Sequence, residues 1–254
     1  MKKILITGAS GYLGGFVVER LRQHYEVTLA DLKPPWWDYS DLRFVQMDVT
    51  DQGQVEASCD GMDAVVHLVA YVRDRFDKAA GQMCDVMVKG VWHVAEACVR
   101  KGVGRMINIS SVIACGCMPT CDRPYRVTDP YQFREGDFFY CLSKHLGEQV
   151  CFAYHQAHGL NVVSLRPGVI AGDGLNPGPE QYENPGRPWF IYVDPHDVAK
   201  AADLAVAAEH ISYGCYNIVA TRRDSLFDWS DAERDLGYLS DYTWPEIPET
   251  KIVS

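Results

Sequence analysis

The hydrophobic and polar positions of this chain form two patterns, which alternate along the sequence. Short, nearly continuous apolar runs rich in Val, Ile and Leu occupy residues 3–7, 26–30, 43–47, 64–69, 105–110 and 161–165. Such runs are typical of strands that are covered on both faces, as in a parallel sheet. Longer segments that we interpret as helices lie between them, at about 13–24, 54–59, 78–101 and 139–158. Strands that alternate with helices predict an α/β protein with a doubly wound parallel sheet and right-handed crossovers.

The pattern weakens after residue 166. Residues 172–188 are rich in Gly and Pro, which predicts a long loop because neither residue suits the interior of a helix or strand. An alanine-rich helix is expected at 197–209 and a short one at 230–236. The length of 254 residues corresponds to one large domain, or to one domain with a small appendage.

Composition and charge mainly exclude classes of partner. There are 24 Lys and Arg against 34 Asp and Glu, so the formal net charge is −10 at pH 7. An acidic chain without a block of basic residues is a poor candidate for binding nucleic acid or an anionic membrane. No apolar run approaches the roughly 18–20 residues that span a bilayer, and the first run reaches Gly8 before a secretory signal could form. We therefore expect a cytoplasmic protein with a small-molecule partner.

The nine cysteines do not predict a disulfide framework, because their number is odd and the chain is long. Cys115, Cys117 and Cys121 place three thiols within seven residues. Their spacing is not that of a zinc ribbon, and no Cys-x-x-Cys pair supplies further ligands. We expect no metal site.

A glycine-rich turn follows the first apolar run. Residues 4–14 read Ile-Leu-Ile-Thr-Gly-Ala-Ser-Gly-Tyr-Leu-Gly and lead from a strand into a helix. Gly8, Gly11 and Gly14 let the backbone turn sharply and approach a pyrophosphate, and the helix N-terminus offers N–H donors. The spacing is GxxGxxG, which matches the generic dinucleotide fingerprint GxGxxG only loosely.

Asp31 ends the next strand, twenty residues after Gly11. A carboxylate at this place accepts hydrogen bonds from ribose hydroxyls and repels a 2′-phosphate, which favours NAD over NADP. Lys33 keeps NADP open as the less favoured alternative. Trp36 and Trp37 could cover the adenine or simply pack on the surface, and the sequence does not choose between these two interpretations.

Candidate chemistry lies on one helix and one strand end. Tyr140 and Lys144 are four residues apart and therefore share a helix face. A neighbouring ammonium favours the phenolate, so Tyr140 could act as a general acid/base near neutrality. Residues 107–111 form a strand that ends in the hydroxyls of Ser110 and Ser111, at the edge where open α/β sheets bind ligands. Capping of the strand is the alternative role for either serine, above all for Ser110.

Together these motifs resemble the extended short-chain dehydrogenase/reductases, the NAD-dependent epimerase/dehydratase group. The resemblance covers about residues 2–238 and includes Asp48-Val49, His67-Leu68-Val69-Ala70, and the runs at 166–172 and 193–199. It implies NAD as the cofactor, and a homodimer through the helices at 78–101 and 139–158. It also implies a Rossmann-type NAD-binding domain over 1–165, with a small C-terminal substrate-binding portion over 166–254 interwoven with it in one compact unit.

The resemblance assigns roles by position. Ser111 corresponds to the catalytic hydroxyl, Tyr140 to the acid/base, and Lys144 to the residue that holds the ribose and tunes Tyr140. The implied cofactor-binding residues are Gly8, Gly11, Tyr12, Leu13, Gly14, Asp31, Leu32, Asp48, Val49, Leu68, Val69, Ala70, Tyr140, Lys144 and Pro167. His67 is expected to be structural. Two positions depart from the family pattern, because Met87 stands where many relatives have Asn, and Cys115 where they usually have Tyr.

The substrate is expected to be small. Only about ninety residues follow Arg166, fewer than nucleotide-sugar enzymes of the family usually have. This length, Arg187 in the Gly/Pro-rich segment, and Phe-Asp-Trp-Ser at 227–230 resemble the uronate dehydrogenases. In that interpretation Ser111, Tyr140 and Arg187 contact the substrate, with Arg187 holding a carboxylate as a planar fork. A solvated surface arginine is an equally weighted alternative.

Three functions follow from the sequence. The first is an NAD-dependent oxidoreductase that acts on a CH–OH group of a sugar or sugar acid. The second is a sugar or nucleotide-sugar epimerase/dehydratase that keeps its NAD and returns the hydride within one turnover. The third is an NAD-binding sensor or scaffold without turnover, against which the intact set Ser111, Tyr140 and Lys144 argues.

Overall fold

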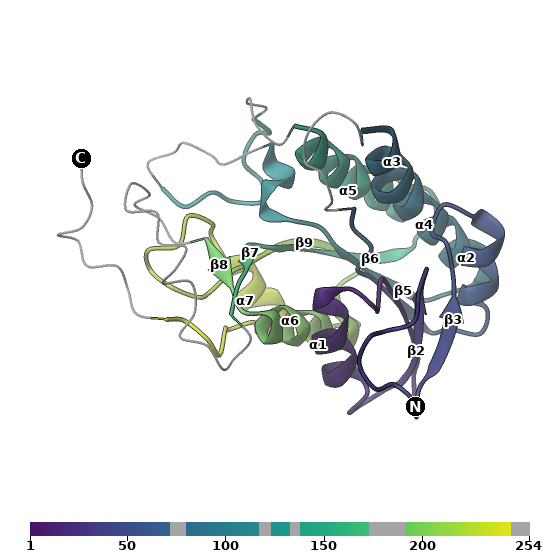
Figure 1. The fold of residues 1–254 in the computed structure, drawn as a ribbon. Coiled ribbons are helices and arrows are strands. Elements are labelled where there is room, and N and C mark those ends of the chain that lie inside the picture. The colour runs from purple at the N-terminus through teal and green to yellow at the C-terminus, as the bar shows by residue number, and fades with distance from the viewer. Residues whose placement is uncertain (72–79, 117–122, 133–137, 173–190, 245–254) are drawn as a thin grey trace.

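A seven-stranded parallel sheet forms the centre of the computed structural model, which describes residues 1–71, 80–116, 123–132, 138–172 and 191–244 (Figure 1). Its strands are β1 (Lys3–Thr7), β2 (Glu26–Asp31), β3 (Arg43–Gln46), β4 (Ala64–His67), β5 (Arg105–Ile109), β6 (Asn161–Pro167) and β9 (Tyr213–Ile218). Their order in the sheet is β3-β2-β1-β4-β5-β6-β9, and every pair is parallel. The doubly wound α/β prediction is confirmed.

Helices cover both faces of this sheet, which explains why the strand sequences are apolar almost without interruption (Figure 1). On one face, α1 (Tyr12–Leu21) and α6 (Pro195–Ala207) pack on each other, with α7 (Ser230–Leu236) beside α6. On the other lie α2 (Gln52–Cys59), α4 (Gly90–Lys101) and α5 (Phe138–His158). In β1, Ile4 and Ile6 belong to the first core and Leu5 to the second, as the period-two geometry of a strand requires.

The segment expected as one helix at 78–101 is more complex. From residue 80 onward it consists of α3 (Ala80–Cys84), a π-helical turn (Asp85–Lys89) and α4. Single π-turns within a helix frequently occur at functional sites. Gly102, with φ of 69°, ends α4 in the left-handed conformation that favours glycine.

The C-terminal third contributes one strand that the sequence pattern did not predict. β9 contains Gly214 and is only half-buried over its first three residues, so it lacks the apolar run that marked the other strands. A short parallel pair, β7 (Val169–Ile170) and β8 (Tyr192–Val193), flanks the predicted loop, of which residues 173–188 lie outside the described residues. Although β9 and α6 follow residue 165, they complete the sheet and one of its helical layers. The expected division at residue 165, between an NAD-binding domain and a substrate-binding portion, stays a prediction.

The carboxyl ends of the central strands meet at one edge of the sheet. Thr7 of β1 pairs with Ala30 of β2 and His67 of β4, and Ile109 of β5 pairs with Leu165 of β6. Segments that follow these strands therefore lie side by side, as expected for a ligand site of an open α/β sheet. Among the described helices, none has the length and apolar character needed to cross a bilayer.

Candidate active site

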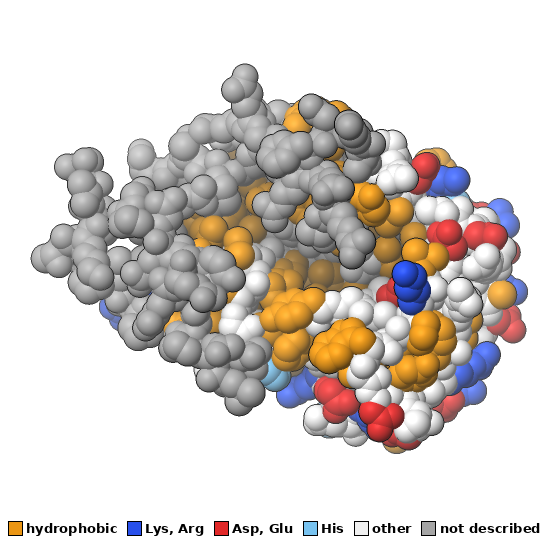
Figure 2. All heavy atoms as spheres, in the orientation of Figure 1, with side chains coloured by type: hydrophobic (Ala, Val, Ile, Leu, Met, Phe, Trp, Pro, Cys, Tyr) orange, Lys and Arg blue, Asp and Glu red, His pale blue; other side chains and the backbone are white. Residues whose placement is uncertain are grey.

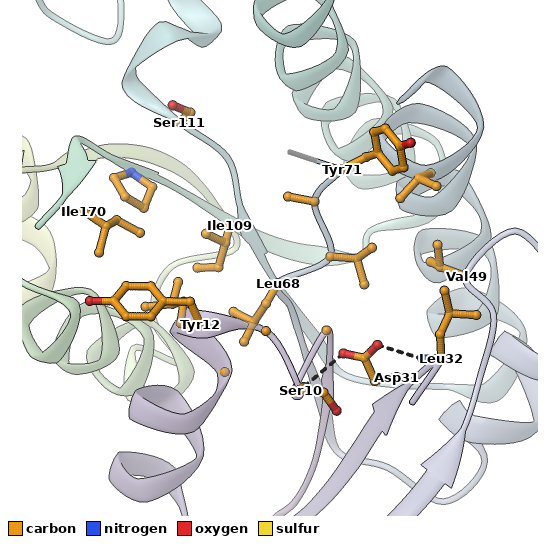
Figure 3. A pocket seen from close by; sticks show the side chains of 18 of the residues that line it. Ser10, Tyr12, Asp31, Leu32, Val49, Leu68, Tyr71, Ile109, Ser111 and Ile170 are labelled. Carbon is orange, nitrogen blue, oxygen red and sulfur yellow. Dashed lines mark hydrogen bonds between the residues drawn. The ribbon is translucent and has the colours of Figure 1, made fainter. Parts of the chain in front are cut away.

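A cavity of about 750 Å³ opens at this edge, between the glycine turn and α5 (Figure 3). It is lined by all fifteen residues that the resemblance assigned to the cofactor, and also by Ser111. Arg187, the remaining candidate, lies outside the described residues. Gly168, which follows Pro167 in the run at 166–172 that carries the family resemblance, lines it too. The lining also includes residues to which the sequence assigned no role: Ser10, Pro34, Met47, Tyr71, Val86, Ile109 and Ile170.

The glycine turn brings backbone rather than side chains to the cavity. Gly8 has φ of +77°, and a Cβ there would lie 2.8 Å from the backbone nitrogen of Val69. A Cβ on Gly14 would lie 2.1 Å from the carbonyl oxygen of Ala9. Gly11 is the N-cap residue of α1 and supplies no capping side chain. The N-terminus of α1, with its positive dipole end, therefore borders the cavity and fits an anionic group such as a pyrophosphate.

Asp31 is fixed at one end of the cavity by two backbone amides. The Ser10 amide donates to Oδ2 at 3.0 Å and the Leu32 amide to Oδ1 at 2.7 Å (Figure 3). A carboxylate oxygen accepts more than one hydrogen bond, so each can also accept from a ribose hydroxyl. The Asp48 carboxylate accepts instead from the amide and hydroxyl of Thr50, which fixes the turn after β3.

Lys144 is buried in the wall formed by α5. Its Nζ donates to the carbonyl oxygen of Ile109 at 2.7 Å and lies 6.0 Å from the centroid of the Tyr140 ring. Burial lowers the pKa of Lys144 to about 8, and the negative charge of Glu148 opposes that effect. Because 8 is above neutrality, Lys144 carries its positive charge beside Tyr140 at pH 7.

The two serines after β5 have different surroundings. Ser111 caps the 3₁₀ turn Val112–Cys115, and its Oγ accepts from the Ile113 amide at 3.4 Å. It lies at the opposite end of the cavity from Asp31 (Figure 3). The Ser110 hydroxyl is buried and donates to Oε1 of Glu148 at 2.5 Å. Both serines line the cavity, but the Ser110 hydroxyl is used in an internal hydrogen bond to Glu148, whereas Ser111 Oγ only accepts from the Ile113 amide.

Sequence reasoning missed Glu148, which pairs with Arg166 beneath the site. The guanidinium donates through Nε to Oε1 at 2.8 Å and through Nη2 to Oε2 at 2.7 Å, and both side chains are buried. Glu148 follows Tyr140 and Lys144 at four-residue steps on α5, so it continues their helix face. This spacing is the signal that could have identified it.

His67 lies inside the sheet, where Thr7 Oγ1 and His67 Nδ1 are 2.7 Å apart. Burial, assisted by the charge of Lys144, lowers the pKa of His67 to about 3, so the ring is neutral near pH 7. The positions that depart from the family pattern are buried as well. Met87 lies in the π-helical turn whose Val86 borders the cavity, and Cys115 packs in the cluster around Tyr125 and Phe227.

In the described part of the chain, no group of three His, Cys, Asp or Glu side chains could hold a metal ion. Cys117 and Cys121 lie outside it, so the expectation of no metal site stays a prediction.

The sequence profile of the NAD dependent epimerase/dehydratase family matches residues 4–243. The chain belongs to this family. The predicted resemblance is confirmed, and the family's dependence on NAD agrees with the predicted cofactor.

Family members of known activity are similar to this chain at moderate identity. Uronate dehydrogenase of Pseudomonas syringae pv. tomato is 30% identical over 171 residues, which are 65% of this chain and 58% of that protein. The match thus spans less than two thirds of the relative. L-arabinose 1-dehydrogenase (NAD(P)(+)) of Haloferax volcanii is 26% identical over 252 residues, which are 94% of this chain and 96% of that protein. The crystal structure of uronate dehydrogenase from Agrobacterium tumefaciens has a TM-score of 0.77 and 23% identity, and the match covers 95% of this chain and 85% of that one. This structural likeness confirms the Rossmann-type fold.

Proposed function

We propose that this protein is an NAD-dependent oxidoreductase that oxidises a CH–OH group of a sugar or sugar acid, with hexuronic acids as the first candidates. The supporting observation is that one cavity extends from the glycine turn and Asp31 to Tyr140, Lys144 and Ser111. The uronate and arabinose dehydrogenases among its relatives supply the substrate class.

The residues present fit NAD. The α1 N-terminus suits the pyrophosphate, Asp31 the adenosine ribose, and Lys144 the second ribose, since its ammonium has three protons and Ile109 accepts only one. When bound, NAD supplies the acceptor for the hydride that leaves the substrate carbon.

The chain's own residues handle the proton. Ser111 Oγ accepts from the Ile113 amide through a lone pair, so its hydrogen can be donated to the substrate hydroxyl oxygen. Tyr140, as the phenolate, removes the hydroxyl proton, and the ammonium of Lys144 stabilises that phenolate. Loss of the proton concentrates negative charge on the substrate oxygen, which favours formation of the carbonyl as hydride leaves the same carbon.

The test is production of NADH from NAD with a panel of hexuronic acids, aldoses and nucleotide sugars. Release of NADH with one of them, lost in Tyr140→Phe, supports the proposal. Product formed without net NADH, on cofactor that stays bound, would instead identify an epimerase or dehydratase, the other activity in the family name. A protein that binds NAD but turns over nothing in the panel would fit the sensor alternative.

We also propose a cytoplasmic homodimer formed through α4 and α5. Trp92 on α4 is 54% exposed, and α5 has exposed or half-buried apolar side chains at Phe139, Leu142 and Leu146. Spacings of three and four residues align these side chains on one helix face. Light scattering should give twice the chain mass, and Leu146→Glu combined with Trp92→Glu should give monomers. A wild-type protein that is monomeric at micromolar concentration would refute the dimer.

A further inference from the structure

The tryptophans that follow Asp31 have opposite environments, although they are neighbours in the sequence. Trp37 packs against the core beneath α1: its Nε1 would lie 3.4 Å from a Cβ built on Gly15, and its ring meets Tyr39 edge-on at 6.3 Å. Trp36 is 85% exposed and lines the cavity. Of these two tryptophans, Trp36 is therefore the one that presents its indole to the cavity.

Exposed apolar surface is concentrated at this cavity. Five large apolar side chains in the described part of the chain are more than half exposed, and three of them, Tyr12, Leu32 and Trp36, line it. Figure 2 shows apolar side chains gathered around a hollow on this face of the molecule. Exposed apolar side chains that cluster at a hollow mark a binding site better than isolated ones do.

The backbone that carries Trp36 is held in place before any ligand arrives. Ser10 Oγ donates to the Lys33 carbonyl at 2.6 Å, and Gln46 Nε2 donates to the Leu32 carbonyl at 3.2 Å. Two prolines at 34 and 35 restrict φ immediately before Trp36. Trp37, anchored after it, fixes the other side, so little backbone entropy is lost when the indole contacts a ligand.

Trp36 is also at the end of the cavity where an adenine would lie. It follows Asp31 and Leu32, and these two residues lie on the opposite side of the cavity from Ser111 (Figure 3). Resting on the proposed NAD site, we infer that the indole of Trp36 stacks on the adenine of the bound dinucleotide, while Trp37 only anchors the segment. Stacking of a base on an aromatic side chain strengthens binding measurably, by roughly 5- to 150-fold in affinity.

The test compares the binding of NAD, ADP-ribose and AMP to Trp36→Ala, Trp36→Phe and Leu239→Ala by titration calorimetry. Leu239 is an exposed apolar residue that does not line the cavity, so its variant is the control for loss of apolar surface. We expect Trp36→Ala to weaken all three ligands about tenfold, Trp36→Phe to retain most of the affinity, and Leu239→Ala to match wild type. AMP should quench more indole fluorescence in wild type than in Trp36→Phe.

The outcomes separate this inference from the function on which it rests. If wild type binds neither NAD nor NADP, the proposed function fails. If wild type binds NAD and Trp36→Ala binds it equally well, adenine stacking is wrong while the NAD site stands. Stacking is also overturned if Trp36→Ala weakens NAD but leaves AMP unaffected, because the effect would not pass through the adenine.

Discussion

Glu148 and Arg166 form a buried, two-point ion pair one helical turn from Lys144, with hydrogen bonds of 2.8 and 2.7 Å. The pair joins α5 to β6, and Ser110 at the end of β5 donates to the same carboxylate. It therefore connects the helix that carries Tyr140 and Lys144 to the strand end that carries Ser111. Its negative member also raises the pKa of Lys144 against the effect of burial.

Glu148→Gln should be strongly destabilising, because it leaves the buried Arg166 guanidinium without its counter-charge. The expected loss in the free energy of unfolding is about 3–5 kcal/mol, measured by urea denaturation. Arg166→Met in the same chain should recover much of it, since both charges are then gone. The exposed pair of Asp231 and Arg234 is the control, and Asp231→Asn should leave the transition unchanged. An equally small effect of Glu148→Gln would contradict the role assigned to the pair.

Tyr140→Phe should lower kcat by roughly 10²- to 10⁴-fold, because it removes the group that we propose exchanges the substrate proton. NAD affinity should stay near wild type, since the ring that borders the cavity is kept. Stopped-flow kinetics and a parallel NAD titration separate these effects.

A pair of variants tests the distinction between the two serines. Ser111→Ala should reduce kcat at unchanged stability, whereas Ser110→Ala should mainly reduce stability, because it removes a donor to Glu148. The reverse pattern would exchange their roles.

Asp31→Ser should shift nucleotide preference toward NADP. The wild-type carboxylate, oriented by the Ser10 and Leu32 amides, would repel a 2′-phosphate, and Lys33 beside it would attract one once that repulsion is gone. We expect the ratio of NAD to NADP affinity to fall at least about tenfold, a change of roughly 1.4 kcal/mol, measured by fluorescence titration. In Asp31→Ser/Lys33→Ala, much of the gain for NADP should disappear. An unchanged ratio of the two affinities would show that Asp31 does not contact the adenosine ribose.

Arg187 stays a prediction from the sequence. If its guanidinium binds a substrate carboxylate, Arg187→Lys should raise KM for a hexuronic acid by roughly tenfold or more, because lysine lacks the planar fork. KM for the corresponding neutral aldose should not change. Equal effects on acid and aldose would favour the alternative of a solvated surface arginine.

Local motifs made much of the fold and site predictable. β1, β2, β4, β5 and β6 are largely buried and therefore have apolar sequences, whereas β9 contains Gly214 and begins half-buried, so its place in the sheet depends on pairing with β6. The glycine turn and Asp31 could be predicted from the sequence, because each lies at the end of a strand that the apolar pattern identifies. The spacing from Tyr140 and Lys144 could have placed Glu148 on their helix face, but its pairing with Arg166 could not be predicted, because the two residues meet only when α5 packs on β6. Likewise, Trp36 and Trp37 are chemically identical, and only packing against Gly15 and Tyr39 distinguishes them.

His67 should make the fold sensitive to acid. Its pKa is about 3 in the folded protein, against a usual value near 6.5 when unfolded. Between these values the unfolded chain binds a proton that the folded chain does not, so the free energy of unfolding falls as pH decreases from 6.5 toward 3. The slope from this group alone is at most about 1.4 kcal/mol per pH unit.

The variant His67→Gln isolates that contribution, because glutamine can still hydrogen-bond Thr7 but does not titrate. Urea denaturation at intervals of pH from about 8 to 4 should give a shallower decline for His67→Gln than for wild type, with the two curves parallel above about pH 7. Carboxylates elsewhere contribute equally to both proteins, so the difference between the curves reports His67 itself. Curves that stay parallel down to pH 4 would mean that the histidine accepts its proton within the folded sheet, and that burial does not exclude the charge.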